Sequence, residues 1–253
     1  MNITNLLTEH VNNNKPISFS KYGDGEFYCA FSRHGRNCDN DTYTEKLGNS
    51  IINSFKYMVE NANNAYIGMW HDSKNKVVWE NIVNKKVNWA DYHSIIIDKQ
   101  NDFDKLKLYK AIKNSNRKKI IICNSLLIKS KILFNADDVV IIPFNNWFDA
   151  HFNNVLNIVC KLINYDDNHI VITCCGMSAK VLICELYKKF PNGIYLDFGS
   201  AIDLICTKKD SRGREYDYNY IRNFLGELLP EQWDDEKFNY IYDEAKSKLG
   251  IHL

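Results

Sequence analysis

Two acidic side chains separated by one glycine are the residues of this sequence best suited to chemistry. Asp24 and Glu26 lie in the segment ISFSKYGDGEFYCAF, residues 17–31, where an apolar run of strand type meets a turn. In an extended segment, residues two apart point to the same side, so we expect the two carboxylates to converge on one metal ion. Gly23 and Gly25 lack a Cβ, which allows a sharp turn and the close approach of a bulky ligand. The alternative is an ordinary surface turn, because Asp-Gly is a common turn dipeptide.

Further polar residues follow the other strand-like runs. In open α/β sheets, ligands collect at the carboxyl ends of the strands, so we expect these residues to meet at one edge of a sheet. The segments concerned are residues 22–26, 70–72, 124–125, 145–151, 176–180 and 197–203.

The segment CCGMSAK, residues 174–180, leads from an apolar strand directly into a helix. Gly176 permits a tight turn, and the free N–H groups of the first helical turn, with Ser178 and Lys180, suit a phosphate. The segment contains neither GxxxxGK[ST] nor a full GxGxxG pattern, so ordinary packing of strand against helix is the alternative.

A basic stretch follows Asp197 and Asp203 and contains Arg212 and Arg214. An arginine beyond a strand end can neutralise a diphosphate by bidentate hydrogen bonding, which a nucleotide leaving group requires. We expect one of these two arginines to be functional, and a solvated loop is the alternative.

Strand-like and helical patterns alternate along the chain, and they must position these residues. Apolar runs at residues 65–70, 93–97, 119–123, 138–144, 169–175 and 193–198 join the first run as predicted strands. Helices are predicted from Thr44 to about residue 61 and over residues 77–82, 103–112, 152–163 and 177–190. Several of the runs show little polar alternation, as is typical of strands buried on both faces. The pattern predicts an α/β protein, a single Rossmann-like domain with a mostly parallel sheet and helices on both faces.

No linker divides the chain, so one domain over residues 1–253 is expected, with an amphipathic helix at residues 231–250 packed onto it. The chain carries 32 Lys and Arg against 31 Asp and Glu, which gives no overall charge to attract nucleic acid. No signal peptide or transmembrane segment is evident, so a cytoplasmic protein is expected. The eight cysteines show no CxxC spacing and are expected to be buried free thiols.

The segments KYGDGEFYCAF and GRNCDNDTYTEKL resemble the amino-terminal signature of the GT-D-type glycosyltransferases, whose hallmark is a DxE motif within an [RK][YF]GDGE segment. Three later segments resemble that family in the same order: IPFNNWF, TCCGMSAKVLICEL, and LDFGSAID followed by an arginine-rich stretch. The resemblance spans roughly residues 17–220. The family usually has Arg where this chain has Lys21, and commonly Pro or another small residue where Cys175 or Met177 stands.

The resemblance implies transfer of a sugar from a nucleoside diphosphate sugar, most often a UDP-sugar, to a glycan or glycoprotein acceptor. It implies Mn²⁺ or Mg²⁺ held by Asp24 and Glu26, which would neutralise the leaving group. The nucleotide-sugar site would contain Lys21, Tyr22, Gly23, Asp24, Gly25, Asn37, Asp39, Gly176, Ser178, Lys180, Asp197, Ser200, and Arg212 or Arg214. If transfer inverts the anomeric centre, Asp149 is the first candidate for the base, and Asp72 is the second. Asp149 also fits a simple helix N-cap.

Two other functions stay open at this stage. The segments HIVITCCGMSAK and GIYLDFG together resemble the glycine turn and acidic strand end of an S-adenosylmethionine-dependent methyltransferase, but that interpretation leaves KYGDGE unexplained. A non-catalytic module that binds nucleotide sugars with the same fold is the second alternative.

Overall fold

The computed structural model of the protein describes residues 2–70, 73–96, 102–164, 168–207 and 228. Several residues singled out in the sequence lie outside the described residues, namely Asp72, Arg212, Arg214 and the predicted helix at residues 231–250.

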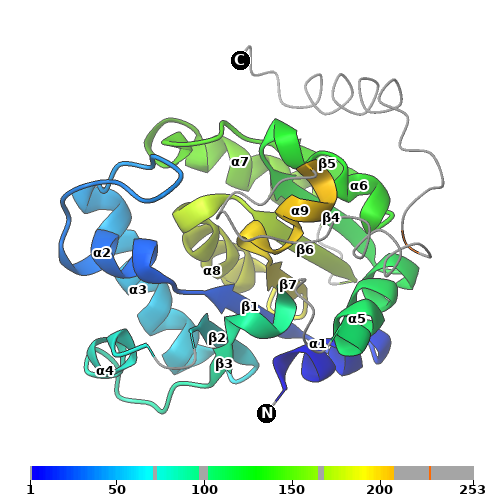
Figure 1. Ribbon diagram of the computed structural model, residues 1–253, viewed down its shortest axis with the longest axis horizontal. Coiled ribbons are helices and arrows are strands. Elements are labelled where there is room, and N and C mark those ends of the chain that lie inside the picture. The colour runs from blue at the N-terminus through cyan, green and yellow to red at the C-terminus, as the bar shows by residue number, and fades with distance from the viewer. Residues whose placement is uncertain (1, 71–72, 97–101, 165–167, 208–227, 229–253) are drawn as a thin grey trace.

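Seven parallel strands form a single sheet in the described part of the chain (Figure 1). They are β1 (Ile17–Lys21), β2 (Ala65–Met69), β3 (Trp89–Asp91), β4 (Lys118–Cys123), β5 (Asp138–Ile141), β6 (His169–Cys174) and β7 (Ile194–Asp197). Their order across the sheet is β3-β2-β1-β7-β6-β4-β5, and every neighbouring pair is parallel. This confirms the predicted α/β fold with a mostly parallel sheet.

Helices cover both faces of this sheet. The α-helices are α1 (Ile3–Asn12), α2 (Asp24–Phe31), α3 (Glu45–Asn61), α4 (Asn75–Glu80), α5 (Asp102–Asn114), α6 (Ser130–Leu133), α7 (Trp147–Ile163), α8 (Ala179–Lys189) and α9 (Asp203–Thr207). Short 3₁₀ helices are η1 (Tyr92–Ile95), η2 (Ser125–Leu127), η3 (Gly176–Ser178) and η4 (Gly199–Ile202). Helix α8 packs against α3, α7 and strand β1, while α1 and α5 pack together on the other side of the sheet (Figure 1). None of the helices in the described part of the chain is long and apolar enough to cross a membrane.

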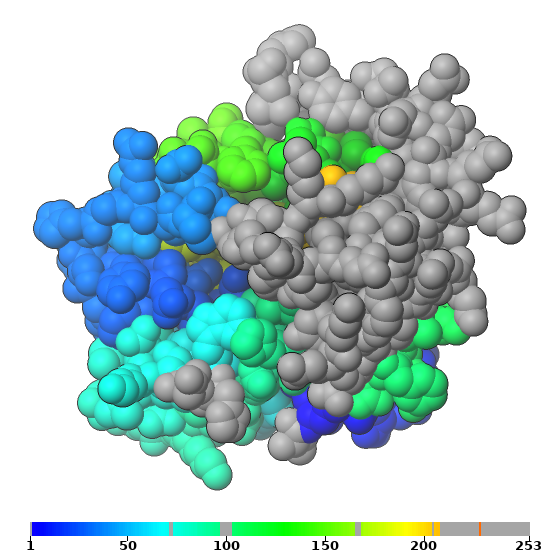
Figure 2. All heavy atoms as spheres, in the orientation of Figure 1, coloured from blue at the N-terminus to red at the C-terminus, as the bar shows by residue number. Residues whose placement is uncertain are grey.

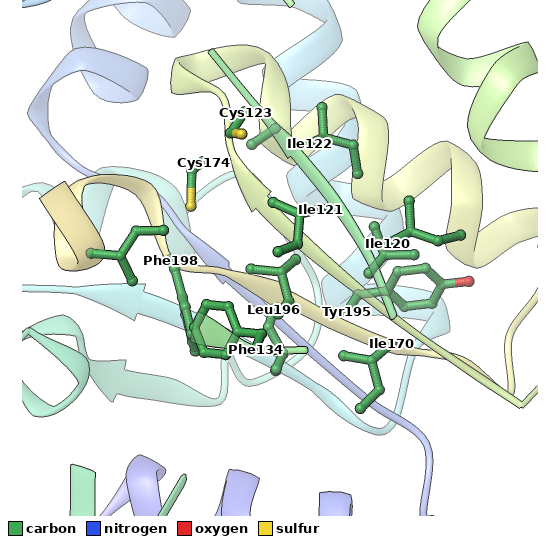
Figure 3. Close-up of a cluster of buried hydrophobic side chains, with 14 of the residues drawn as sticks. Ile120, Ile121, Ile122, Cys123, Phe134, Ile170, Cys174, Tyr195, Leu196 and Phe198 are labelled. Carbon is green, nitrogen blue, oxygen red and sulfur yellow. The ribbon is translucent and has the colours of Figure 1, made fainter. Parts of the chain in front are cut away.

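The core explains why the strand sequences are continuous runs of apolar residues. Ile120, Ile121 and Ile122 of β4 are completely buried although they point alternately to opposite faces (Figure 3). Both faces of β4 are therefore covered, and no polar alternation is possible there. Burial of each such side chain contributes about 1.5–3 kcal/mol.

One predicted strand differs from the structure, and some helices were not predicted. The run at residues 93–97 was predicted as a strand, but the strand is β3 and residues 92–95 form η1. Asp91 stops the strand because its side chain accepts the His93 N–H, 3.1 Å away, and caps the 3₁₀ turn. Helix α1 was not predicted, although Ile3, Leu7 and Val11 recur every four residues and are buried.

Helices α2 and α3 approach each other closely at a glycine. A Cβ on Gly48 of α3 would overlap the carbonyl oxygen of Cys29 in α2, so no larger residue fits without moving one helix. Because α2 begins at Asp24, this contact also fixes the position of the acidic segment.

We therefore predict that Gly48→Ala destabilises the protein even though alanine is the better helix former by about 1 kcal/mol. The overlap with backbone should lower the free energy of unfolding by about 1–3 kcal/mol in a chemical denaturation experiment. Asn53→Ala, at an exposed position of the same helix, is the control and should change stability by less than about 0.5 kcal/mol. Equal stability of the two variants would contradict the contact.

Candidate active site

The acidic segment is helical rather than extended. Helix α2 begins at Asp24, and Gly23 is its N-cap. Successive helical residues turn by about 100°, so residues two apart point in nearly opposite directions. The predicted extended geometry, with both carboxylates on the same side, is therefore wrong: Asp24 is exposed, and Glu26 is buried. The helix starts here because the Glu26 carboxylate accepts the Gly23 N–H through Oε2, at 2.8 Å.

Lys180 is the centre of a buried ion cluster. Its Nζ lies 2.7 Å from Oε1 of Glu26 and 2.9 Å from Oδ2 of Asp197. It also donates to the Gly176 carbonyl, 3.0 Å away. These three contacts use all three donors of the ammonium group. The lysine side chain is 1% exposed, so a phosphate could bind it directly only by displacing one of these acceptors.

Electrostatics keep Glu26 and Lys180 ionised. Burial alone would raise the pKa of Glu26, but the ammonium groups of Lys180 and Lys21 outweigh burial and lower it. Burial alone would lower the pKa of Lys180, but Asp197 and Glu26 outweigh burial and raise it. The lysine and the glutamate are therefore both charged at neutral pH.

Asp197 also joins strand β7 to strand β1. Its Oδ2 accepts the backbone N–H of Lys21 at 3.0 Å, beyond the last paired residues of these strands. The Lys21 ammonium group lies 4.5 Å from the centre of the Tyr92 ring, and that tyrosine donates to the Phe198 carbonyl. Lys21 is thus held at the sheet edge with its charge partly accessible.

A cleft of about 720 Å³ lies at this edge of the sheet. Its polar lining contains Lys21, Asp24, Glu26, Asn37, Asp39, Asn124, Lys180, Ser200, Asp203 and Thr207, with Gly23, Gly25, Gly176 and Gly199. Five of the six predicted strand-end segments contribute residues to this cleft, and residues 145–151 do not. Tyr22, Ser178 and Asp197 do not line the cleft; Tyr22 is buried instead, with its ring against Phe55 and Trp79.

Most of the apolar lining was not predicted. It comprises Met69, Trp70, Tyr92, Leu126, Leu127, Ile142, Phe144, Cys174, Cys175 and Met177. Leu126 is 61% exposed and Phe144 is 51% exposed, which is high for large apolar side chains. Trp70 and Met177 lie in predicted strand-end segments, whereas the exposed Leu126 and Phe144 do not. Apolar residues directly after β4 and β5 were the available signal in the sequence.

The loop between α2 and α3 forms one wall of the cleft. Oδ1 of Asn37 accepts the N–H groups of Asp39 and Asp41, at 2.9 and 2.8 Å. Asp41 in turn accepts the backbone N–H of Asn146 at 2.7 Å, which ties the loop to the start of α7. In Figure 2 the blue atoms of this part of the chain adjoin the green atoms of the α7 region. The Asn37 side chain is thus engaged in shaping the loop.

Gly176 is required by the turn after β6, as predicted. Its φ is +67°, in the left-handed region, and an added Cβ would lie 2.9 Å from Oδ2 of Asp41. The glycine thus allows the loop wall to close against the turn. Ser178 faces a small depression on the other side, which Asp41, Asn146 and Asp149 also line.

The candidate bases are not assembled in the described cleft. Asp149 lies in the first turn of α7, whose N-cap is Asn146, and its Oδ1 is 3.5 Å from Nζ of Lys46. It lines the small depression rather than the large cleft. Asp72 lies outside the described residues, so the base assignment stays a prediction.

The described residues fit a divalent cation in part. No group of three or more His, Cys, Asp or Glu side chains is arranged there to hold a metal ion. Magnesium at nucleotide sites usually needs one or two carboxylates, with phosphate oxygens and water completing its coordination. Asp24, exposed and lining the cleft, fits this requirement. Glu26 fits poorly, because its buried carboxylate is paired with the Lys180 ammonium, which a cation at this group would have to approach closely.

Comparison with known proteins identifies the fold. No family model matches the sequence, and no curated protein matches it. A solved structure described as the selenomethionine-substituted domain of unknown function 1792 matches with a TM-score of 0.61 and 16% identity, covering 96% of this chain and 91% of that chain. A second, whose description states that this highly conserved domain has a distinct glycosyltransferase fold, matches with a TM-score of 0.60, 15% identity and the same coverage. The chain thus shares the fold of these two structures, which the second description calls a distinct glycosyltransferase fold.

We predict that Lys180→Met strongly destabilises the protein, because it leaves two carboxylates buried without their shared partner. Removing one member of a buried ion pair costs about 3–5 kcal/mol, measurable by urea denaturation. Lys188→Met, in the same helix, removes a lysine from a partly exposed pair with Glu185 and should cost less than about 1 kcal/mol. A similar, small loss in both variants would show that the cluster contributes little.

Proposed function

We propose that the protein is a glycosyltransferase that uses a nucleoside diphosphate sugar, a UDP-sugar, as donor. The observation that carries this proposal is the large cleft at the carboxyl edge of a glycosyltransferase-type fold, with acidic and basic side chains at strand ends β1, β6 and β7. Ligands of open α/β sheets bind at this edge. The acceptor is proposed to be a glycan or glycoprotein.

The polar part of the cleft is proposed to bind the diphosphate. Lys21 offers a positive charge that is partly exposed, and the amino-terminal end of α2 opens into the same cleft. Positive charge there lowers the energy of the departing nucleoside diphosphate. A divalent cation, Mn²⁺ or Mg²⁺, would add Lewis-acid stabilisation of that leaving group, with Asp24 as its protein carboxylate.

The apolar part of the cleft is proposed to hold the ring systems of the substrates. Trp70 is partly exposed and lines the cleft beside Tyr92, with their ring centres 5.3 Å apart. An indole supported in this way presents a fixed flat surface to a nucleobase or a sugar ring.

Incubation of the protein with Mn²⁺ and a panel of UDP-, GDP- and TDP-sugars tests the proposal. Release of the nucleotide without acceptor is expected to be slow but measurable, and only with some donors. Inertness with the whole panel, combined with tight binding of one nucleotide sugar, would favour the non-catalytic binding module. Calorimetry with S-adenosylmethionine tests the methyltransferase alternative, which predicts binding of that cofactor without metal.

We predict that Asp24→Asn lowers metal-stimulated turnover by about 10²–10³-fold, because developing charge on the leaving group is left without compensation. The variant should keep its fold, since the Asp24 side chain is exposed. Asp104→Asn is the matched control: it removes a carboxylate of α5 that accepts hydrogen bonds from Asn2 and Asn5, away from the cleft. Turnover of Asp24→Asn equal to that of the control would remove Asp24 from the site.

A further inference from the structure

We propose that Glu26 is not a metal ligand but a positioning residue, which acts through Lys180 and the start of α2 to hold Asp24 at the cleft. The inference rests on the proposed function, because it concerns the cation and nucleotide of that reaction. It gives different roles to Asp24 and Glu26, which the sequence suggested as a pair of metal ligands.

The first argument is that both oxygens of Glu26 are engaged inside the protein, one of them by a buried ammonium group. Oε2 of Glu26 accepts the Gly23 N–H at 2.8 Å, and Oε1 accepts the Lys180 ammonium at 2.7 Å. The glutamate side chain is 6% exposed. A cation at either oxygen would have to approach a buried ammonium group closely, and like charges at short distance repel strongly where water is excluded.

The second argument is charge balance. Lys180 is the shared partner of two buried carboxylates, those of Glu26 and Asp197. If Glu26 turned outward to a metal, one bond of the buried ammonium would be lost and the Gly23 N–H would lose its acceptor. Both losses leave buried polar groups unpaired, which proteins rarely tolerate.

The third argument is the position of Asp24. It is the first residue of α2, directly after the Gly23 N-cap that Glu26 holds. Its carboxylate is exposed and its Oδ1 lies 3.5 Å from the amide of Asn75, a contact that is long for a hydrogen bond. Glu26 therefore fixes the helical turn that carries Asp24, and Asp24 is the carboxylate of this segment that a cation can reach.

Binding of Mn²⁺ in the presence of UDP, measured by electron paramagnetic resonance without turnover, tests this assignment. Asp24→Asn should weaken Mn²⁺ binding by at least about tenfold, because a ligand is lost. Glu26→Ala should weaken it by about tenfold, because the first turn of α2 loses its anchor, as when an outer partner of a metal ligand is removed. Glu26→Gln keeps a carbonyl oxygen for the Gly23 N–H but turns its NH₂ group toward the Lys180 ammonium, so it is tested in the Lys180→Met background, where that conflict is absent. There it should leave Mn²⁺ binding within about threefold of that of Lys180→Met alone.

A direct ligand role predicts a different result: added to Lys180→Met, Glu26→Gln would weaken Mn²⁺ binding as strongly as Asp24→Asn does in the same background. That result would overturn the inference while leaving the glycosyltransferase proposal intact. Failure of the unchanged protein to bind Mn²⁺ with UDP would instead overturn the metal-dependent function, and this inference with it.

Thermal unfolding gives a second, independent measurement in case a variant binds poorly for reasons of folding. Lys180→Met leaves Glu26 and Asp197 as neighbouring buried carboxylates, so adding Glu26→Gln to it should raise the melting temperature by several degrees relative to Lys180→Met alone. Adding Asp24→Asn to Lys180→Met should not raise it. Equal effects of the two additions would contradict a direct pair between Glu26 and Lys180.

Discussion

The buried ammonium group of Lys180 is the interaction on which this edge of the protein depends. It joins the start of α2, the end of β7 and the turn after β6 through Glu26, Asp197 and the Gly176 carbonyl. Desolvation makes each of these charges costly alone, so the three segments are stable together and not apart. The cluster therefore sets the geometry of the cleft, although its own charges are mostly hidden from solvent.

The strand order makes this cluster possible. β1, β7 and β6 are adjacent in the sheet, so residues far apart in the chain end at the same edge. Close packing completes the arrangement: Gly48 lets α2 lie against α3, and Gly176 lets the loop containing Asp41 lie against the β6 turn. The result is one cleft with a charged part near β1 and an apolar part near β4 and β5.

The elements of the fold were largely predictable from the sequence. Strands buried on both faces, such as β4 and β6, consist of continuous apolar residues, and helices such as α3 have apolar residues repeating along one buried face. The errors have local causes. Asp91 caps a 3₁₀ turn where a strand was expected, and Glu26 caps a helix where an extended turn was expected. In both places one side-chain hydrogen bond to the backbone outweighed the propensity of the surrounding residues.

The sequence by itself determined the parallel α/β architecture, the edge at which polar residues gather and the need for glycine at position 176. Only the tertiary structure decided what the charged residues do there. Periodicity reports which side of an element a residue faces, but it carries no information about the partner across the sheet. From the sequence, Lys180 and Glu26 were expected to bind ligands. In the structure they pair with each other and hold the cleft in place, while Asp24 remains exposed to the cleft.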